Sequence, residues 1–146
     1  MPPKDPLASY TFSLEIQGLT EATFREGGGF ESETEVIEAR EVGKGGVTYI
    51  KKLPGALKWS NIVLRRGITD SLDLWKWRKK VIDGDIEGAR MDGSVVIYNT
   101  KGQEVSRYNF VRGWPAKWKA SDLNAAANEV VLEELEIAHE GLVRVK

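Results

Sequence analysis

The sequence contains no cysteine and a single histidine, His139, in 146 residues. The absence of cysteine excludes disulfides, thiolate metal sites and cysteine nucleophiles. One histidine rules out a histidine-rich metal site and leaves one possible base for a serine–histidine–aspartate triad. Neither the GxSxG pattern of a nucleophile elbow nor the HExxH pattern of a zinc protease occurs. We therefore expect no catalytic residue, no metal and no cofactor, and we interpret His139 as a structural residue near a strand end.

The chain also lacks an excess of charge of one sign and any long apolar run. Its 21 basic residues are balanced by 22 acidic residues, which gives a formal net charge of −1. Bulk charge therefore does not indicate nucleic-acid binding. No run approaches the roughly 20 apolar residues of a membrane-spanning helix, and the N-terminus does not read as a signal peptide. A hydrophobic content of 41% and a charged content of 29% are typical of a globular domain.

Apolar residues recur with a period of two rather than 3.6, which predicts β-strands. The alternation is clearest over 10–17 and 129–139. Further strands are predicted at 21–25, 30–42, 47–53, 57–66, 94–99, 104–112 and 114–120. We expect the three glycines at 27–29 to lie outside regular elements, and Leu53-Pro54-Gly55 to break the chain. The residues expected in the core are Phe12, Leu14, Trp59, Trp77, Leu135 and Ile137.

One segment predicts a helix instead. The helix is expected at about 70–82: Thr69 or Asp70 is a possible cap, residues 72–82 follow it, and Gly84 is a stop signal. Residues 122–128 are interpreted as a loop. The pattern as a whole predicts a mainly β protein with one domain over 1–146. We expect an antiparallel β-barrel or sandwich with one α-helix and a long extended β-hairpin.

The expected hairpin covers residues 30–53, with its turn at Gly43-Lys44-Gly45-Gly46. Its first strand would extend roughly 40 Å, whereas a usual strand has about five or six residues. Neither face of that strand is apolar enough to drive burial. A two-stranded ribbon of this kind is marginally stable alone in water and has two open edges.

Two interpretations of this hairpin are a solvated arm and an assembly element that completes a sheet across subunits. Its length and its open edges favour the assembly element. The residues expected to form the interface between subunits are Glu33, Thr34, Glu35, Val36, Ile37, Glu38, Arg40, Val47, Tyr49 and Lys51.

Other segments allow different functions. Residues 75–80 interleave tryptophan with basic residues, as single-stranded nucleic-acid binders do, although helix anchoring and a basic helix end explain the same pattern. Glutamates over 31–41 and 129–140 would suit a glycosidase, but dense acids on strands more often form a solvated face. The glycines at 27–29 match no phosphate loop, and no calcium-loop pattern occurs. The main alternative is therefore a monomeric β-barrel module that binds single-stranded nucleic acid.

Several motifs, taken together and in order, resemble phage-type tail tube proteins. In the first half they are Asp5-Pro6-Leu7, the strand 10–16, the glutamate-rich strand with the glycines 43–46, and the segments 51–55, 57–59 and 64–69. In the second half they are Asn109-Phe110 and the segments 113–118, 123–125, 128–130 and 133–142. The resemblance extends from Asp5 to Leu142, nearly the whole chain.

The resemblance implies a subunit of the inner tube of a contractile phage tail, a tailocin or an extracellular contractile injection system. Its fold would be similar to that of the Hcp tube protein of type VI secretion. It implies hexameric rings stacked into a hollow tube, which sheath contraction drives through a target envelope. The implied partners are copies of the chain itself, a sheath protein, baseplate and terminator or cap proteins, and protein or DNA cargo in the lumen.

The resemblance also implies where the protein acts and what it does not do. Assembly would take place in the bacterial cytoplasm, as part of a phage tail or a tail-like particle that can be released from the cell. A water-filled lumen suits a polar inner face, and the stiffness of the tube would come from main-chain hydrogen bonds. No side chain needs to perform chemistry, so the resemblance implies a structural protein and no enzyme.

Overall fold

The structure is a computed structural model that describes residues 10–17, 22–67, 71–120 and 132–146. It divides into two compact units. The body is formed by the chain up to Phe30 and from Asn61 onward, and the hairpin by residues 31–60. The two units are described separately below.

The body is built on an antiparallel sheet of eight strands. They are β1 (Thr11–Ile16), β2 (Ala22–Phe24), β3 (Glu26–Gly28), β6 (Ile62–Gly67), β7 (Met91–Tyr98), β8 (Glu104–Ala120), β9 (Leu132–Ala138) and β10 (Gly141–Arg144). The order is β2-β1-β7-β8-β9-β6-β3, with β10 beside β8. Within the described residues the end strands β2 and β3 do not pair with each other, so the sheet is not closed into a barrel. The expected mainly β, antiparallel fold is confirmed, and the closed barrel is wrong.

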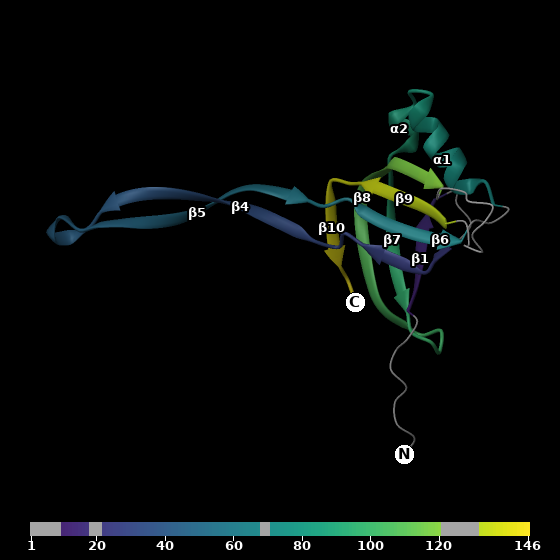
Figure 1. Ribbon diagram of the computed structural model, residues 1–146, viewed down its shortest axis with the longest axis horizontal. Coiled ribbons are helices and arrows are strands. Elements are labelled where there is room, and N and C mark those ends of the chain that lie inside the picture. The colour runs from purple at the N-terminus through teal and green to yellow at the C-terminus, as the bar shows by residue number, and fades with distance from the viewer. Residues whose placement is uncertain (1–9, 18–21, 68–70, 121–131) are drawn as a thin grey trace, which may run out of the picture. The chain divides into compact units, whose positions relative to one another are not determined.

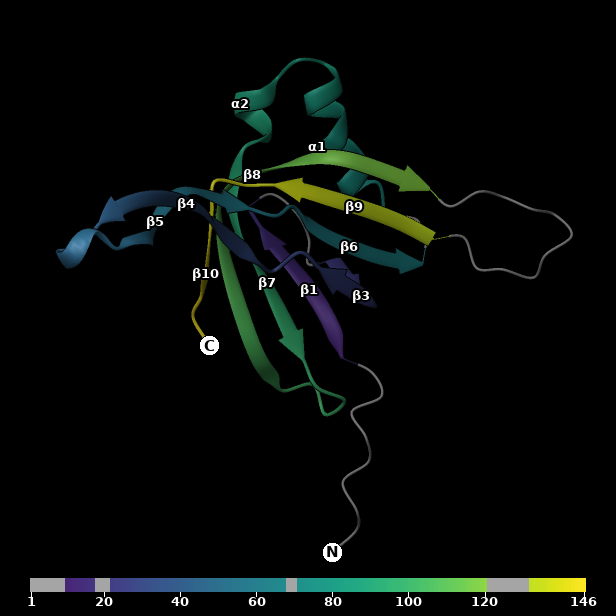
Figure 2. The ribbon, with the colours of Figure 1, turned by 60° about the vertical axis from the view of Figure 1, so that its left-hand side comes forward.

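The long strand β8 joins the two parts of this sheet by bending, as Figure 2 shows. Its first part pairs with β7 and β10, and its second part pairs with β9. At the bend Arg112 has a φ of 49°, and its N–H donates to Asp92 Oδ1 at 2.9 Å. A Cβ on Gly113 would lie 2.4 Å from the Phe110 ring, so only glycine fits there. The two strands expected at 104–112 and 114–120 are therefore one bent strand.

The core of the body contains most of the residues expected there. Leu14, Leu135 and Ile137 are fully buried, and Trp77 is nearly so. Phe12 is half-buried and packs against this core. The expectation for Trp59 is wrong, because this residue ends the second hairpin strand and is partly exposed.

The helix α1 (Asp73–Ile82) confirms most of the helix expected over 70–82. The possible caps at residues 69 and 70 lie outside the described residues, as does the loop expected at 122–128. Leu74 and Trp77 form the buried face of α1, and Trp77 Nε1 donates to Ala89 O at 2.7 Å. Ala89 ends α2 (Ile86–Ala89), a short helix that the sequence pattern did not predict.

Three other local expectations are wrong. Gly27 and Gly28 belong to the short strand β3, because their backbones pair with β6. The chain does not break at 53–55, and the strand expected at 57–66 is divided between the hairpin and β6. The edge strand β10 was not predicted. Each of these differences depends on strand pairing between segments distant in sequence, which local periodicity does not report.

A buried ion pair links β6 to β9. Arg66 Nε donates to Glu133 Oε2 at 3.0 Å, and Trp118 Nε1 donates to Glu133 Oε1 at 2.7 Å. The side chains of Arg66 and Glu133 are 7% and 4% exposed. Glu133 lies on the same face of β9 as Leu135, so the solvated-face interpretation is wrong for this glutamate.

We expect Glu133→Ala to lower the free energy of unfolding by about 3–5 kcal/mol, because it leaves the buried Arg66 charge unpaired. The matched control is Glu134→Ala on the same strand, whose partner Arg65 is half-exposed. That change should cost about 1 kcal/mol or less. Urea denaturation followed by circular dichroism measures both. Equal losses for the two variants would contradict the structural role given to the buried pair.

Candidate assembly hairpin

The hairpin consists of β4 (Ser32–Val42) and β5 (Thr48–Trp59), which lie side by side along their length (Figure 1). They are joined through the 3₁₀ turn Lys44–Gly46, where Gly45 and Gly46 have φ values of 79° and 75°. Such values favour glycine, which explains the glycines of this turn. The pairing runs from Ser32 opposite Trp59 to Val42 opposite Thr48, with an irregularity between Thr34 and Val36.

The hairpin has no core of its own. No residue between 31 and 60, all of which the structure describes, is buried. Its exposed large hydrophobic residues are Val36, Ile37, Val42, Val47, Tyr49, Ile50, Leu53 and Leu57. A free two-stranded ribbon is marginally stable in water, and exposed apolar surface of this kind is typical of interaction sites.

The register assigns the expected interface residues to two faces. Thr34, Val36, Glu38 and Arg40 share one face, opposite residues that include Leu57, Pro54, Lys52 and Ile50. Glu33, Glu35 and Ile37 lie on the other face with Tyr49 and Lys51. Val47 lies between the turn and β5, and is 67% exposed. The structure thus gathers the expected residues on one hairpin but divides them between its two faces.

Next to the turn, the face that holds Tyr49 and Lys51 carries a small polar cluster around Glu41. The Tyr49 hydroxyl donates to Glu41 Oε2 at 2.7 Å, and Lys51 Nζ lies 3.8 Å from Glu41 Oε1. The hydrogen bond to Glu41 raises the pKa of Tyr49 above its ordinary value. Tyr49 is therefore a neutral hydrogen-bond donor at physiological pH.

The main chain of the hairpin presents different free edges on its two strands. Gly43 N–H donates to Val47 O at 2.8 Å, which sets the alternation of inward and outward groups. In β4 the even-numbered residues from Val36 to Val42 therefore direct N–H and C=O groups away from β5. In β5 an outward position is held by Pro54, which has no N–H. The free edge of β4 keeps a full set of donors, whereas that of β5 is interrupted.

Charge also distinguishes the two strands. β4 carries four glutamates and a single basic residue, Arg40, whereas β5 carries Lys51, Lys52 and Lys58 and no acid. Lys58 was not among the expected interface residues, because the second strand of the hairpin was expected to end at Leu53. A partner edge that is basic would therefore complement β4.

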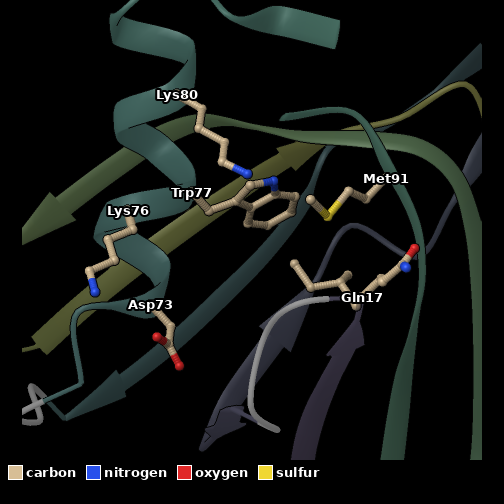
Figure 3. A pocket seen from close by; sticks show the side chains of 7 residues that line it. Gln17, Asp73, Lys76, Trp77, Lys80 and Met91 are labelled. Carbon is tan, nitrogen blue, oxygen red and sulfur yellow. The ribbon is translucent and has the colours of Figure 1, made fainter. Parts of the chain in front are cut away.

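The tryptophans of the segment 75–80 are used in packing within the body. Trp77 is 4% exposed, and Trp75 packs edge-on against Trp118 with ring centres 4.9 Å apart. Beside α1 is an open hollow of about 220 Å³ into which Trp77 and Met91 point (Figure 3). Ligand pockets usually enclose about 300–1,000 Å³. The buried indole of Trp77 cannot stack on a nucleotide base, whereas Trp75 is 39% exposed, so one of the two tryptophans that suggested the nucleic-acid alternative is excluded from such a role.

The candidate chemical residues lie in structural contacts. The ring centres of His139 and Phe110 lie 6.4 Å apart. Glu134 pairs with Arg65, and Glu136 accepts a hydrogen bond from Asn61 Nδ2 at 3.1 Å. Among the described residues, no three acidic, histidine or cysteine side chains are grouped so that they could hold a metal. None of the helices in the described part of the chain is long and apolar enough to cross a membrane.

The chain was compared with models of known families, with curated sequences and with solved structures. The sequence model of the family described as T4-like virus tail tube protein gp19 matches residues 8–143. A search of curated protein sequences found no match.

Three solved structures illustrate the likeness of fold. A chain in the PVC sheath-tube complex, an extracellular contractile injection system in its extended state, has a TM-score of 0.78 at 20% identity, and the match covers 97% of this chain and 93% of that one. A chain in the 6-fold symmetrised baseplate of the anti-feeding prophage has a TM-score of 0.74 at 17% identity, covering 99% and 97%. Hcp1 from Flavobacterium johnsoniae has a TM-score of 0.54 at 16% identity, covering 92% and 94%. The expected likeness to tail tube and Hcp folds is confirmed.

Proposed function

Because the chain belongs to the T4-like virus tail tube protein gp19 family, we propose that it is an inner tube subunit of a contractile injection system or phage tail. In this proposal copies of the chain form hexameric rings, and the rings stack into a hollow tube. The observation that carries the proposal is the hairpin of residues 31–60, which exposes apolar residues and free strand edges. Association of copies would cover these groups, which promote aggregation when they are exposed to water.

The interface expected within the tube is the one formed by the hairpin residues named above. Strand addition supplies main-chain hydrogen bonds around and between rings, and a sheet closed across subunits has no free edges. Stiffness then comes from backbone pairing rather than from individual side chains. The protein is accordingly proposed to be structural, with no enzymatic activity and no cofactor.

The partners proposed for the tube are a contractile sheath, a baseplate and a terminator or cap. The similar structures are described as a sheath-tube complex, a baseplate and a tube-terminating cap, which supports this set. Sheath contraction would drive the tube through a target envelope, and protein or DNA cargo would occupy the lumen. Assembly in the bacterial cytoplasm, with later release of the particle in some systems, completes the proposal.

The assembly state of the purified protein is a direct test of this function. Negative-stain electron microscopy and native mass spectrometry should show rings of six copies, and stacks of rings at higher protein concentration. A strict monomer that binds single-stranded oligonucleotides with strong salt dependence would instead establish the alternative binding module. If the protein formed no rings and no tubes over a wide range of protein and salt concentrations, the tube proposal would be refuted.

We expect His139→Ala to leave ring and tube formation intact, because His139 contacts Phe110 and is proposed to take no part in chemistry. A small fall in melting temperature from lost packing is the largest effect expected. Electron microscopy and thermal denaturation measure the two properties. If tubes and contraction remained normal while injection of cargo was lost, a chemical role for His139 would have to be considered.

A further inference from the structure

The edge strand β10 and the two residues after it form an exposed segment with two apolar side chains. From Val143 to Lys146 every residue is exposed, and Val143 and Val145 are 62% and 52% exposed. In the described part of the chain β10 pairs with β8 alone, so its other edge is open. An open edge with exposed valines is a template for another strand.

The register of β10 identifies which of its main-chain groups are free. Val145 N–H donates to Arg107 O at 2.9 Å, in register with Val143 opposite Asn109. Inward and outward groups alternate in an antiparallel pair. Leu142 and Arg144 therefore direct their N–H and C=O groups toward the open edge, away from β8.

We propose that the open edge of β10 receives the β4 edge of a second copy of this chain. The two edges are complementary in charge at one position, because Arg144 is basic and Glu38 is the acid on the corresponding face of β4. Of the two hairpin edges, β4 is the better partner for β10, because β4 keeps all its outward N–H groups whereas β5 has Pro54, which lacks an N–H, at its free edge. The interface joins two different surfaces, so it propagates from copy to copy and can close into a ring or continue into a stack.

The arrangement of outward groups selects one register. Strand pairs throughout the described sheet are antiparallel, and antiparallel pairing places outward residues of the two edges opposite each other. The outward residues of β4 include one acid, Glu38, and Arg144 is the outward basic residue of β10. Placing Arg144 opposite Glu38 also sets Val145 opposite Ile37 and Val143 opposite Ala39. Both apolar pairs then lie on one face, opposite the ion pair.

The absence of native cysteine allows a direct test by disulfide formation between copies. A mixture of two single variants, Val145→Cys and Ile37→Cys, should form a mixed disulfide dimer when rings or tubes are present. Their Cα atoms would be about 4.5 Å apart as a non-hydrogen-bonded pair, within the range that a disulfide spans. The control mixture of Val143→Cys with Ile37→Cys is two residues out of register and should give little or no dimer.

Charge reversal provides a second test that does not depend on oxidation. Arg144→Glu and Glu38→Arg should each raise the protein concentration needed for assembly by about tenfold or more, and the double variant should recover most of that loss. Lys146→Glu combined with Glu38→Arg is the control, and it should not restore assembly. Melting temperatures of the single variants check that the body remains folded.

The inference rests on the proposed tube function, and its failure is distinguishable from the failure of that function. Absence of rings and tubes from the unmodified protein refutes the tube proposal itself. Normal tubes that give no mixed disulfide above the control, or that assemble equally well with each charge-reversal variant, overturn the pairing of β4 with β10 and leave the tube proposal standing.

Discussion

Replacing Leu135 with aspartate is expected to prevent the body from folding. Leu135 is fully buried in β9, opposite Leu64 of β6 on one side and Trp118 of β8 on the other. Removing a buried leucine side chain typically costs about 2–5 kcal/mol. Burying a carboxylate with no partner adds several kcal/mol more. The sum is comparable with the whole stability of a typical domain, about 5–15 kcal/mol.

Circular dichroism and thermal denaturation of the purified Leu135→Asp protein measure this effect. The matched control is Leu132→Asp, which makes the same change at a residue of β9 that is 40% exposed. The control should remain soluble and melt cooperatively near the temperature of the unmodified protein. A soluble Leu135→Asp protein with a cooperative transition would show that the placement of β9 in the core is wrong.

The double variant Thr34→Pro with Val36→Pro is expected to abolish tube formation while the body remains folded. Both residues lie at positions of β4 whose N–H groups point to the free edge, so proline removes no hydrogen bond within the hairpin. The same change removes two donors from the edge through which strand addition would occur. The expected result is normal circular dichroism and melting, with no stacked tubes in electron micrographs.

The control for this variant is Thr34→Ala with Val36→Ala, which shortens both side chains and keeps both N–H groups. If backbone donors carry assembly, the alanine variant should still form tubes, at a somewhat higher protein concentration. Normal tubes from the proline variant would refute the edge of β4 as an assembly element. The hairpin would then be the solvated arm of the first interpretation.

Sequence alone determined the features that depend on local pattern. The alternation around Leu14 and Leu135 predicted two strands of the core, because one face of each must be buried. The helix was predicted from its apolar stripe and from Gly84, and the hairpin from its two extended runs around the glycines 43–46. The motifs over most of the chain pointed to the tail tube family by their residue types, order and spacing.

The tertiary structure alone decided the features that depend on pairing between distant segments. The bend of β8 at Arg112, the burial of Glu133 beside Arg66, and the edge strand β10 have no local signal of comparable strength. Pro54 reads as a strand breaker in the sequence, and the register explains why it is tolerated: its missing N–H would point to a free edge. Which main-chain groups are free for a second copy is fixed by that register, and a shift of one residue would exchange every inward group for an outward one.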